Sequence, residues 1–327
     1  MKKVIVAITT YNLEKYISQA LDSVLMQKTS FDFLIKVADD CSTDRTIEIL
    51  KEYKNRYPTK IELLFADNNM GSLANSNRLF DHIDCEYLSF LDGDDYWIDE
   101  HRLQEQVEFL DSHPEYTLIG GNTQLLKDGV LSEFQLDDRM LGKSFSFEDY
   151  LNGKIPCVVH TSSILLRNVI FKHGLPDCYS KLIGTFEESA VRGEDFRRLL
   201  HLKKGLLFVE DKIRSIYRIH EGGTWQGSSL LRVYLETVIS YNFYIKYFGK
   251  EHSDFFMKKR DLSYGNLMAF MLSNKLLMNS NRLPSKDATL FGGLMADMAR
   301  NNSKSLDLSY HKYRMHLFRI LLKLGLF

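Results

Sequence analysis

The chain has 327 residues, of which 44% are hydrophobic and 26% charged, an ordinary composition for a soluble globular protein. That length is enough for one large domain or two modest ones. The formal net charge of −1 argues against a general affinity for nucleic acid, so no nucleic-acid partner is expected.

Two further classes of feature are not indicated. The four cysteines lie far apart without paired spacing, so neither a zinc site nor a disulfide framework is expected. No run approaches the roughly 20 apolar residues of a membrane span. The first residues turn polar too soon for a signal peptide. We therefore expect a cytoplasmic protein.

Strands and helices alternate four times in the first ninety residues. Strands are predicted at Val4–Thr9, Phe33–Ala38, Lys60–Phe65 and Glu86–Leu91. Amphipathic helices are expected at Leu13–Met26, from Ser42 or Asp44 to about Tyr57, and after Ser72, which we expect to cap its helix. Such alternation predicts an α/β fold, Rossmann-like, with a mostly parallel sheet flanked by helices.

Polar residues follow the first, second and fourth of these strands. They are Thr9 to Asn12, Asp39-Asp40, and Asp92-Gly93-Asp94-Asp95. Ligands of open α/β sheets bind beyond the carboxyl ends of the strands, so this edge is the expected site. No Gly-x-Gly-x-x-Gly follows any predicted strand, so the dinucleotide fingerprint is missing.

The acidic turn after the fourth strand is the most informative part of the chain. Asp92, Asp94 and Asp95 would repel one another, and each would resist ionising unless a cation compensates them. A divalent ion with oxygen ligands that also bridges phosphates meets that need. The alternative is a structural turn in which Asp99 caps the helix His101–Leu110.

The middle of the chain is expected to build the acceptor side. Thr117–Gly121 and Thr123–Leu126 are predicted to be short strands, followed by a hairpin turn at Lys127-Asp128-Gly129. Ser146 begins a capping box for a short helix. Ser162–Arg167 is predicted to be another strand and Glu194–Leu202 a helix, and His160 and Thr161 are candidates to face the acceptor.

Five motifs in this order resemble those of inverting family 2 glycosyltransferases with the GT-A fold. They are Thr10-Tyr11-Asn12, Asp39 to Asp44, Asp92 to Asp95, Arg192-Gly193-Glu194-Asp195, and Tyr217-Arg218-Ile219-His220. The resemblance covers roughly residues 1–225. It implies a hexosyltransferase that moves a sugar from a nucleotide-diphospho-sugar to a hydroxyl acceptor with the help of Mn²⁺ or Mg²⁺.

The resemblance also assigns roles. Asp94 and His220 are the expected metal ligands, while Asp95 is either a ligand or a neighbour of the ligands. Asp195 is the expected catalytic base, with Glu194 orienting it. The remaining expected residues bind the donor: Thr10 and Tyr11 flank its base and ribose beside Asn12, Asp40 accepts a uracil-like ring N–H, and Asp92 meets the ribose or a metal-bound water.

Two departures from the family pattern concern the donor. The family often has Ala-Arg-Asn where this chain has Asn75-Ser76-Asn77, although Arg78 follows, and it usually has glycine in place of Cys41. The two tryptophans, Trp97 and Trp225, either stack on a sugar or are simply buried.

From residue 229 the pattern changes to helices. They are expected at Leu230–Phe248, Phe255–Met278, from Leu283-Pro284-Ser285 onward, and at Leu308–Leu326. We accordingly divide the chain into a GT-A domain (1–228) and a helical region (229–327). The aromatic residues of the helical region are most simply packing residues, and a homodimer interface is the alternative.

The helical region is also basic. It holds 15 Lys and Arg against 7 Asp and Glu, a net charge of +8, which leaves −9 for residues 1–228 because the whole chain is −1. Residues 308–327 interleave basic and apolar side chains, as helices that lie on anionic bilayers do. Contact with the inner face of the membrane and packing on the protein body are equal alternatives.

Two functions of different class follow. The first is a metal-dependent glycosyltransferase, with UDP-sugar as the expected donor and a glycan, a lipid-linked molecule or a protein as acceptor, in cell-surface glycan assembly. The second is a non-catalytic scaffold of the same fold. Retention of Asp94, Asp195 and His220 favours the enzyme.

Overall fold

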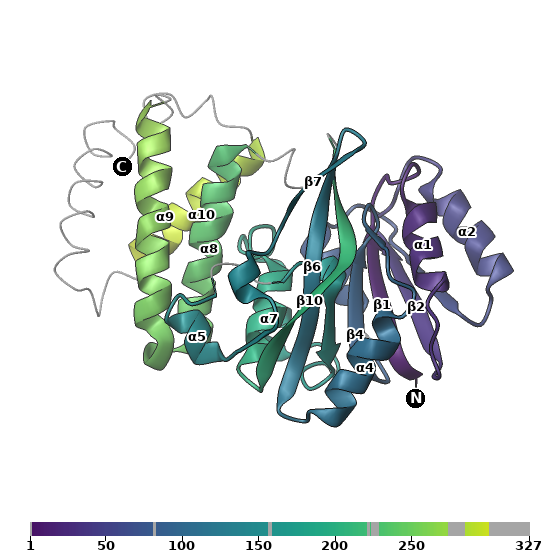
Figure 1. The fold of residues 1–327 in the computed structure, drawn as a ribbon. Coiled ribbons are helices and arrows are strands. Elements are labelled where there is room, and N and C mark those ends of the chain that lie inside the picture. The colour runs from purple at the N-terminus through teal and green to yellow at the C-terminus, as the bar shows by residue number, and fades with distance from the viewer. Residues whose placement is uncertain are drawn as a thin grey trace. The chain divides into compact units, whose positions relative to one another are not determined.

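The computed structural model describes residues 2–80, 83–155, 159–220, 223, 229–273 and 285–300 (Figure 1). The chain divides into two compact units. The first is Met1–Ile183 with Arg192–Gly227, and the second is Gly184–Val191 with Ser228–Phe327. The short segment Gly184–Val191 thus belongs with the helices although it lies within the expected GT-A domain.

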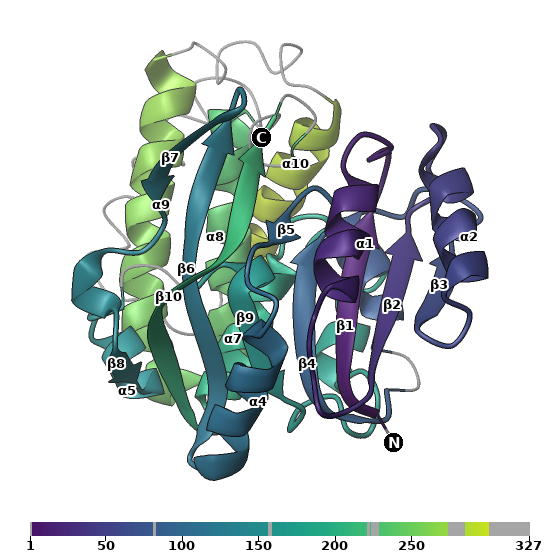
Figure 2. The same ribbon diagram turned by 45° about the vertical axis from the view of Figure 1, so that its right-hand side comes forward.

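The first unit is built on one ten-stranded sheet in the order β3-β2-β1-β4-β9-β6-β10-β5, with β7 beside β6 and β8 beside β10 (Figure 2). Strands β1 to β4 are mutually parallel, as predicted. Strand β9 runs antiparallel to both β4 and β6, so the second half of the sheet is mixed. The strands are β1 (Lys2–Thr10), β2 (Phe33–Asp39), β3 (Ile61–Phe65), β4 (Cys85–Asp92), β5 (Tyr96–Trp97), β6 (Tyr116–Lys127), β7 (Val130–Phe134), β8 (Lys143–Phe145), β9 (Ile164–Arg167) and β10 (Leu206–Ile219).

Helices flank this sheet because each has an apolar face to bury. Alternate residues of β1, Val4, Val6 and Ile8, join the apolar faces of α1, α2 and α4 in one core cluster. The helices of this unit are α1 (Ile17–Leu25), α2 (Thr46–Arg56), α3 (Ser72–Arg78), α4 (Arg102–Ser112), α5 (Phe147–Leu151), α6 (Asp177–Ser180) and α7 (Gly193–Leu202). The capping box at Ser146 is present as predicted.

The register of the sheet aligns the ends of three strands. Thr9 of β1 lies opposite Asp92 of β4, and Thr10 lies opposite Asp39 of β2. The backbone N–H of Asp40 donates to the carbonyl of Thr10 at 3.0 Å. The polar residues that follow these strands therefore meet at one edge, as the sequence predicts.

Three predicted details are wrong. Residues 116–127 form one strand rather than two, because Gly120 and Gly121 continue the ladder where Cβ atoms would meet Val159 and Arg214. Helix α1 begins at Ile17, because side chains from the loop after β2 and from the first residue of α2 accept from the N–H groups of residues 12–14. Gly71 rather than Ser72 precedes α3, and no side chain caps that helix.

Strand β10 has no counterpart among the predicted elements. Its pairing with β6 shifts register between Val209 and Ser215, which interrupts the regular alternation of a strand. Beyond this irregularity Ser215 and Ile216 pair with Trp97 and Tyr96 of β5. Because β5 directly follows the acidic turn, this pairing carries the end of β10 to the same edge of the sheet.

The second unit contains α8 (Leu230–Phe248), α9 (Ser253–Ser273) and α10 (Ser285–Arg300). Helix α8 has the predicted bounds. It holds the segment Gly184–Val191 through Arg232 and Ser240, which donate to the carbonyls of Ser189 and Ala190, and through an ion pair of Lys246 with Glu187. The expected helix at 308–326, and residues 274–278 of the expected helix Phe255–Met278, lie outside the described residues.

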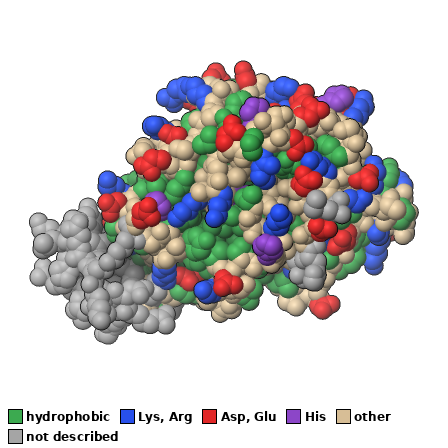
Figure 3. All heavy atoms as spheres, turned by 90° about the horizontal axis from the view of Figure 1, so that it is seen from below, with side chains coloured by type: hydrophobic (Ala, Val, Ile, Leu, Met, Phe, Trp, Pro, Cys, Tyr) green, Lys and Arg blue, Asp and Glu red, His purple; other side chains and the backbone are tan. Residues whose placement is uncertain are grey.

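None of the helices in the described part of the chain is long and apolar enough to cross a membrane. On the face shown in Figure 3, acidic and basic side chains are mixed among polar and hydrophobic ones. This mixture agrees with the near-zero net charge of the sequence.

Candidate active site

The acidic turn is fixed to the end of β1 by the glycine within it. The N–H of Gly93 donates to the carbonyl of Thr9 at 3.0 Å. A Cβ atom at Gly93 would lie only 2.8 Å from that carbonyl oxygen, so a larger residue does not fit. The glycine therefore lets Asp92, Asp94 and Asp95 sit directly against the polar end of β1.

Asp94 and His220, the two expected metal ligands, lie together. Oδ2 of Asp94 is 3.0 Å from Nε2 of His220, and both side chains are largely buried. Two ligands about 2.1 Å from an octahedral ion are about 3.0 Å apart when they occupy adjacent positions. The pair therefore fits a divalent ion, and without one the same distance makes a hydrogen bond from the imidazole N–H to the carboxylate.

Arg218 connects β10 to the acidic turn. Its Nε donates to the carbonyl of Asp94 at 2.8 Å, and its backbone N–H donates to Oδ1 of Asp95 at 3.1 Å. The guanidinium lies over the rings of Tyr16 and Tyr96, 4.6 and 5.2 Å from their centroids. Because hydrogen bonds and two aromatic rings hold the arginine, the end of β10 has a fixed position beside the turn.

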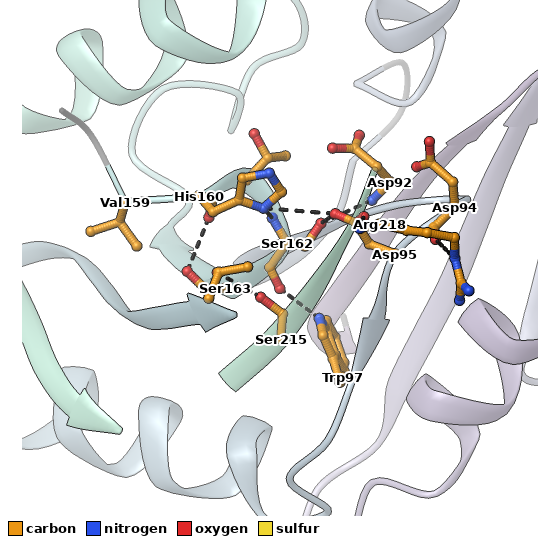
Figure 4. Close-up of polar contacts among 12 residues, drawn as sticks. Asp92, Asp94, Asp95, Trp97, Val159, His160, Ser162, Ser163, Ser215 and Arg218 are labelled. Atoms are coloured by element: carbon orange, nitrogen blue, oxygen red, sulfur yellow. Dashed lines mark hydrogen bonds and ion pairs between the residues drawn. The ribbon is translucent and has the colours of Figure 1, made fainter. Parts of the chain in front are cut away.

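Asp95 is buried and turns away from Asp94 (Figure 4). Its Oδ2 accepts from the hydroxyl of Ser162 at 2.5 Å. Nδ1 of His160 lies 3.7 Å from the same oxygen. Ser162 and His160 precede β9, on the part of the chain that we expected to build the acceptor side.

The carboxylates of the acidic turn repel one another, and this shifts their pKa values. Burial, with Asp94 and Glu194 nearby, raises the pKa of Asp92 to about 7. Burial and the charges of Asp94 and Asp92 raise the pKa of Asp95 well above its usual value. Carboxyl groups whose pKa is raised by neighbouring negative charge bind a cation readily, because the cation offsets that charge and favours the ionised form.

A second set of ligand atoms lies at the same turn. One atom each of Asp92, Asp95 and His160 lie within 4.8 Å of one another. Burial, with the charge of Arg198, lowers the pKa of His160 to about 3, so the imidazole is neutral. However, Asp95 already accepts two hydrogen bonds, whereas Asp94 and His220 face each other, which makes the latter pair the better ligands.

The loops after β1 and β2 form the other side of the site. Thr10 is buried with its hydroxyl unpaired among the described residues, Tyr11 is 45% exposed, and Asn12 has a positive φ of 53°. Oδ1 of Asn12 accepts from the N–H of Thr43 at 2.7 Å, which joins the two loops. An exposed tyrosine beside an unpaired hydroxyl is able to receive a base and ribose.

Asp40 has a structural role, which was the alternative to base recognition. Its two carboxylate oxygens accept from the N–H groups of Met70 and Gly71 at 2.8 and 2.9 Å, and the residue is buried. Each oxygen has a second acceptor position, so an additional N–H can still be accepted. Cys41 follows with a positive φ of 63°, where the family usually has glycine.

The two acidic residues of α7 lie in its first turn, with no side chain capping the helix. Asp195 is ion-paired with Arg198 of the next turn and remains about one-third exposed. Arg198 also donates to the carbonyl of Val159 and the hydroxyl of Thr161. Glu194 is near enough to the acidic turn to raise the pKa of Asp92.

Sequence reasoning missed several members of this site. Arg198 and Ser162 contact predicted site residues, but only tertiary contacts identify them, because arginines and serines are common. Arg218 lies within a quoted motif, yet only its contact with Asp94 gives it a part in the site. Trp97 is buried, and its Nε1 donates to the carbonyl of Ser162, so it does not stack on a sugar. Trp225 lies outside the described residues.

Comparison with protein families gives one match. A profile described as glycosyl transferase family 2 matches residues 5–174, more than half of the chain. An uncharacterized protein of Mycobacterium tuberculosis is 28% identical over 219 residues, which are 67% of this chain and 59% of that protein. This chain thus spans less than two-thirds of that relative.

Staphylococcus aureus poly(ribitol-phosphate) beta-N-acetylglucosaminyltransferase TarS is 36% identical over 122 residues, which are 36% of this chain and 21% of TarS. The structure of its residues 1–349 with UDP-GlcNAc has a TM-score of 0.60 at 19% identity and covers 89% of this chain and 79% of that one. The mannosyltransferase PcManGT of Pyrobaculum calidifontis, solved with GDP-Man and Mn²⁺, has a TM-score of 0.52 at 15% identity and covers 97% and 80%. These likenesses show a shared GT-A-like fold.

Proposed function

This chain belongs to glycosyl transferase family 2, and on that premise we propose that it is an inverting, metal-dependent glycosyltransferase that uses a UDP-sugar. The observation that carries the proposal is the meeting of Asp94 and His220 at the carboxyl edge of the sheet. A divalent ion held there would stabilise the negative charge that develops on a nucleoside diphosphate as it leaves.

The donor nucleotide would lie along the ends of β1 and β2. Tyr11 is exposed for stacking, the hydroxyl of Thr10 has no hydrogen-bond partner among the described residues, and Asp40 keeps acceptor capacity for a ring N–H such as that of uracil. Asn12 holds this loop to that of β2. The uracil preference rests on Asp40, because an acceptor selects a base that offers an N–H at that position.

Asp195 would act as the general base. Inversion by direct displacement requires that the acceptor hydroxyl attack the anomeric carbon from the face opposite the nucleoside diphosphate, while its proton passes to a carboxylate on the acceptor side. Arg198 holds Asp195 in place, and the carboxylate is exposed enough to receive a proton. Glu194, one residue earlier in the same helical turn, would orient it and adds to the charge near Asp92.

The acceptor would be a hydroxyl of a glycan, a lipid-linked molecule or a protein in cell-surface glycan assembly. TarS, which this chain resembles over 122 residues, is named for transfer to poly(ribitol-phosphate). The basic residues of 308–327 would bring the enzyme to the inner face of the membrane, where a lipid-linked acceptor is found.

A thermal-shift panel of UDP, GDP, CMP and dTDP, each with Mn²⁺ or with EDTA, tests this function. UDP with Mn²⁺ should stabilise the protein most, by about 2.7 kcal/mol at 100 times its dissociation constant. A larger shift with GDP would overturn the UDP assignment. Binding of UDP-sugars without transfer to water or to any hydroxyl acceptor would favour the non-catalytic scaffold.

A further inference from the structure

Ser162, two residues before strand β9, hydrogen-bonds to the acidic turn (Figure 4). Its hydroxyl donates to Oδ2 of Asp95 at 2.5 Å, and the Oγ atom of Ser162 in turn accepts from the backbone N–H of Asp92 at 3.3 Å. We propose that Ser162 is a positioning residue that sets the acidic turn for binding of the metal–nucleotide pair. This inference rests on the proposed function and concerns a residue outside its binding and catalytic set.

Asp95 depends on this hydroxyl because its carboxylate is almost completely buried, with 1% of the residue exposed. One oxygen accepts from the N–H of Arg218 and the other from Ser162. A buried carboxylate oxygen that loses its hydrogen-bond donor is left unsatisfied, so the side chain shifts towards another donor. Such a shift would displace Asp94, the preceding residue, from its place opposite His220.

Ser162 is itself held by a rigid support. The indole Nε1 of Trp97 donates to its carbonyl at 2.6 Å, and the guanidinium of Arg102 lies 3.9 Å from the centroid of the Trp97 ring. Arg102 also donates to the hydroxyl of Ser89 and to the carbonyl of Ile164 at the start of β9. These buried contacts fix the serine backbone, so its hydroxyl has a defined direction.

The serine also orients His160. Its backbone N–H donates to Nδ1 of His160 at 3.3 Å, which places the ring proton on Nε2. Nδ1 lies 3.7 Å from Oδ2 of Asp95, the oxygen that Ser162 binds. One residue therefore sets two of the polar groups that line the turn.

Ser163 is a matched control in the next position. Both serines are completely buried, but the hydroxyl of Ser163 donates to the carbonyls of Gly121 and His160 and makes no hydrogen bond to the acidic turn among the residues that the structure describes. Ser163→Ala therefore removes the same atom from an equally buried site. It reports the structural cost of losing a buried serine hydroxyl here.

The test measures Mn²⁺ binding directly, by the EPR signal of free Mn²⁺ titrated into protein with saturating UDP, alongside thermal unfolding. Ser162→Ala should weaken Mn²⁺ binding about 10- to 100-fold, as loss of a group that supports metal ligands does. Ser163→Ala should change the Mn²⁺ affinity less than about twofold, although it should lower Tm by an amount similar to that of Ser162→Ala. Asp95→Asn with Ser162→Ala should bind no more weakly than Asp95→Asn alone, because the serine acts through that carboxylate.

Equal Mn²⁺ binding by Ser162→Ala and Ser163→Ala, with Asp94→Ala binding none, would overturn the positioning role while leaving the proposed function intact. Failure of the wild-type protein to bind Mn²⁺ with any nucleotide would overturn the proposed function and this inference with it. If Ser162→Ala does not fold, Ser162→Cys keeps the volume with a weaker donor and should still weaken Mn²⁺ binding more than Ser163→Ala does.

Discussion

Asp94 and His220 are 126 positions apart in the chain, yet Oδ2 of the first lies 3.0 Å from Nε2 of the second. Each comes from the end of a different strand, and the two-stranded pairing of β10 with β5 brings them together. Arg218 fixes the geometry, since it binds the backbone of Asp94 from two positions before the histidine. The site is therefore assembled by the sheet rather than by either loop alone.

We expect His220→Ala and Asp94→Ala to affect metal-dependent nucleotide binding specifically. Asp94→Ala should remove the effect of Mn²⁺ on UDP binding, and His220→Ala should raise the Mn²⁺ concentration required by about tenfold or more. Calorimetric titration of UDP at several Mn²⁺ concentrations measures both. Asp138→Ala, at an exposed aspartate, is the control, and unchanged Mn²⁺ dependence in Asp94→Ala would show that the ion binds elsewhere.

Asp195→Asn should leave donor binding intact and lower transfer by about 10²- to 10⁴-fold, because the amide accepts no proton from the acceptor hydroxyl. The substitution keeps the size of the side chain and a carbonyl oxygen for Arg198. Initial rates with the natural acceptor and UDP affinity are compared in the same preparation. Near-normal turnover would identify another base, with Glu194→Gln the next variant to measure.

Asp92 should make the free protein less stable as the pH rises. Its pKa is raised from the model-compound 3.8 to about 7, so the folded state binds this proton more tightly than the unfolded state does. The stability that the protonated Asp92 carboxyl contributes is complete below about pH 4 and is lost as the pH rises towards 7. Asp92→Asn should therefore raise Tm at pH 7 in EDTA and make Tm fall less steeply between pH 4 and 7. A parallel pH profile for Asp92→Asn and the wild-type protein would contradict the assignment.

Deletion of residues 308–327 should leave turnover on a short soluble acceptor nearly unchanged and abolish sedimentation with anionic vesicles at low salt. Each basic residue near such a surface contributes about 1 kcal/mol, weakened by salt. Neutral vesicles are the control. Absence of vesicle binding by the intact chain would contradict the membrane role, and unfolding on deletion would show that these residues pack on the protein.

The pattern of apolar strands followed by polar residues predicted the first half of the fold well. Val4, Val6 and Ile8 are buried on one face of β1, and the turns after β1, β2 and β4 meet as expected. Hydrophobic periodicity and polar residues at strand ends can be read locally in the sequence. Because parallel strands end at the same edge of the sheet, the polar residues after them come together there. Helix α8, a long amphipathic segment, was likewise predicted with its observed bounds.

The second half of the sheet was not predictable in the same way. Strand β10 carries a register irregularity that breaks its alternation, and β9 runs antiparallel between two longer strands. A strand's partners are chosen by contacts distant in the chain, which no local pattern records. The family resemblance nevertheless pointed to His220, because a motif is recognised by its residue types and does not depend on regular hydrophobic alternation.

The sequence alone determined which side chains are present at the edge of the sheet: the three aspartates of the turn, the two acids of α7 and the histidine after β10. Only the tertiary structure decided their surroundings, by separating Asp94, which faces His220, from Asp95, which is buried against Ser162. Neighbouring aspartates are chemically identical in sequence. Burial and hydrogen-bond partners, which depend on the packing of strands β9 and β10 around the turn, make them different.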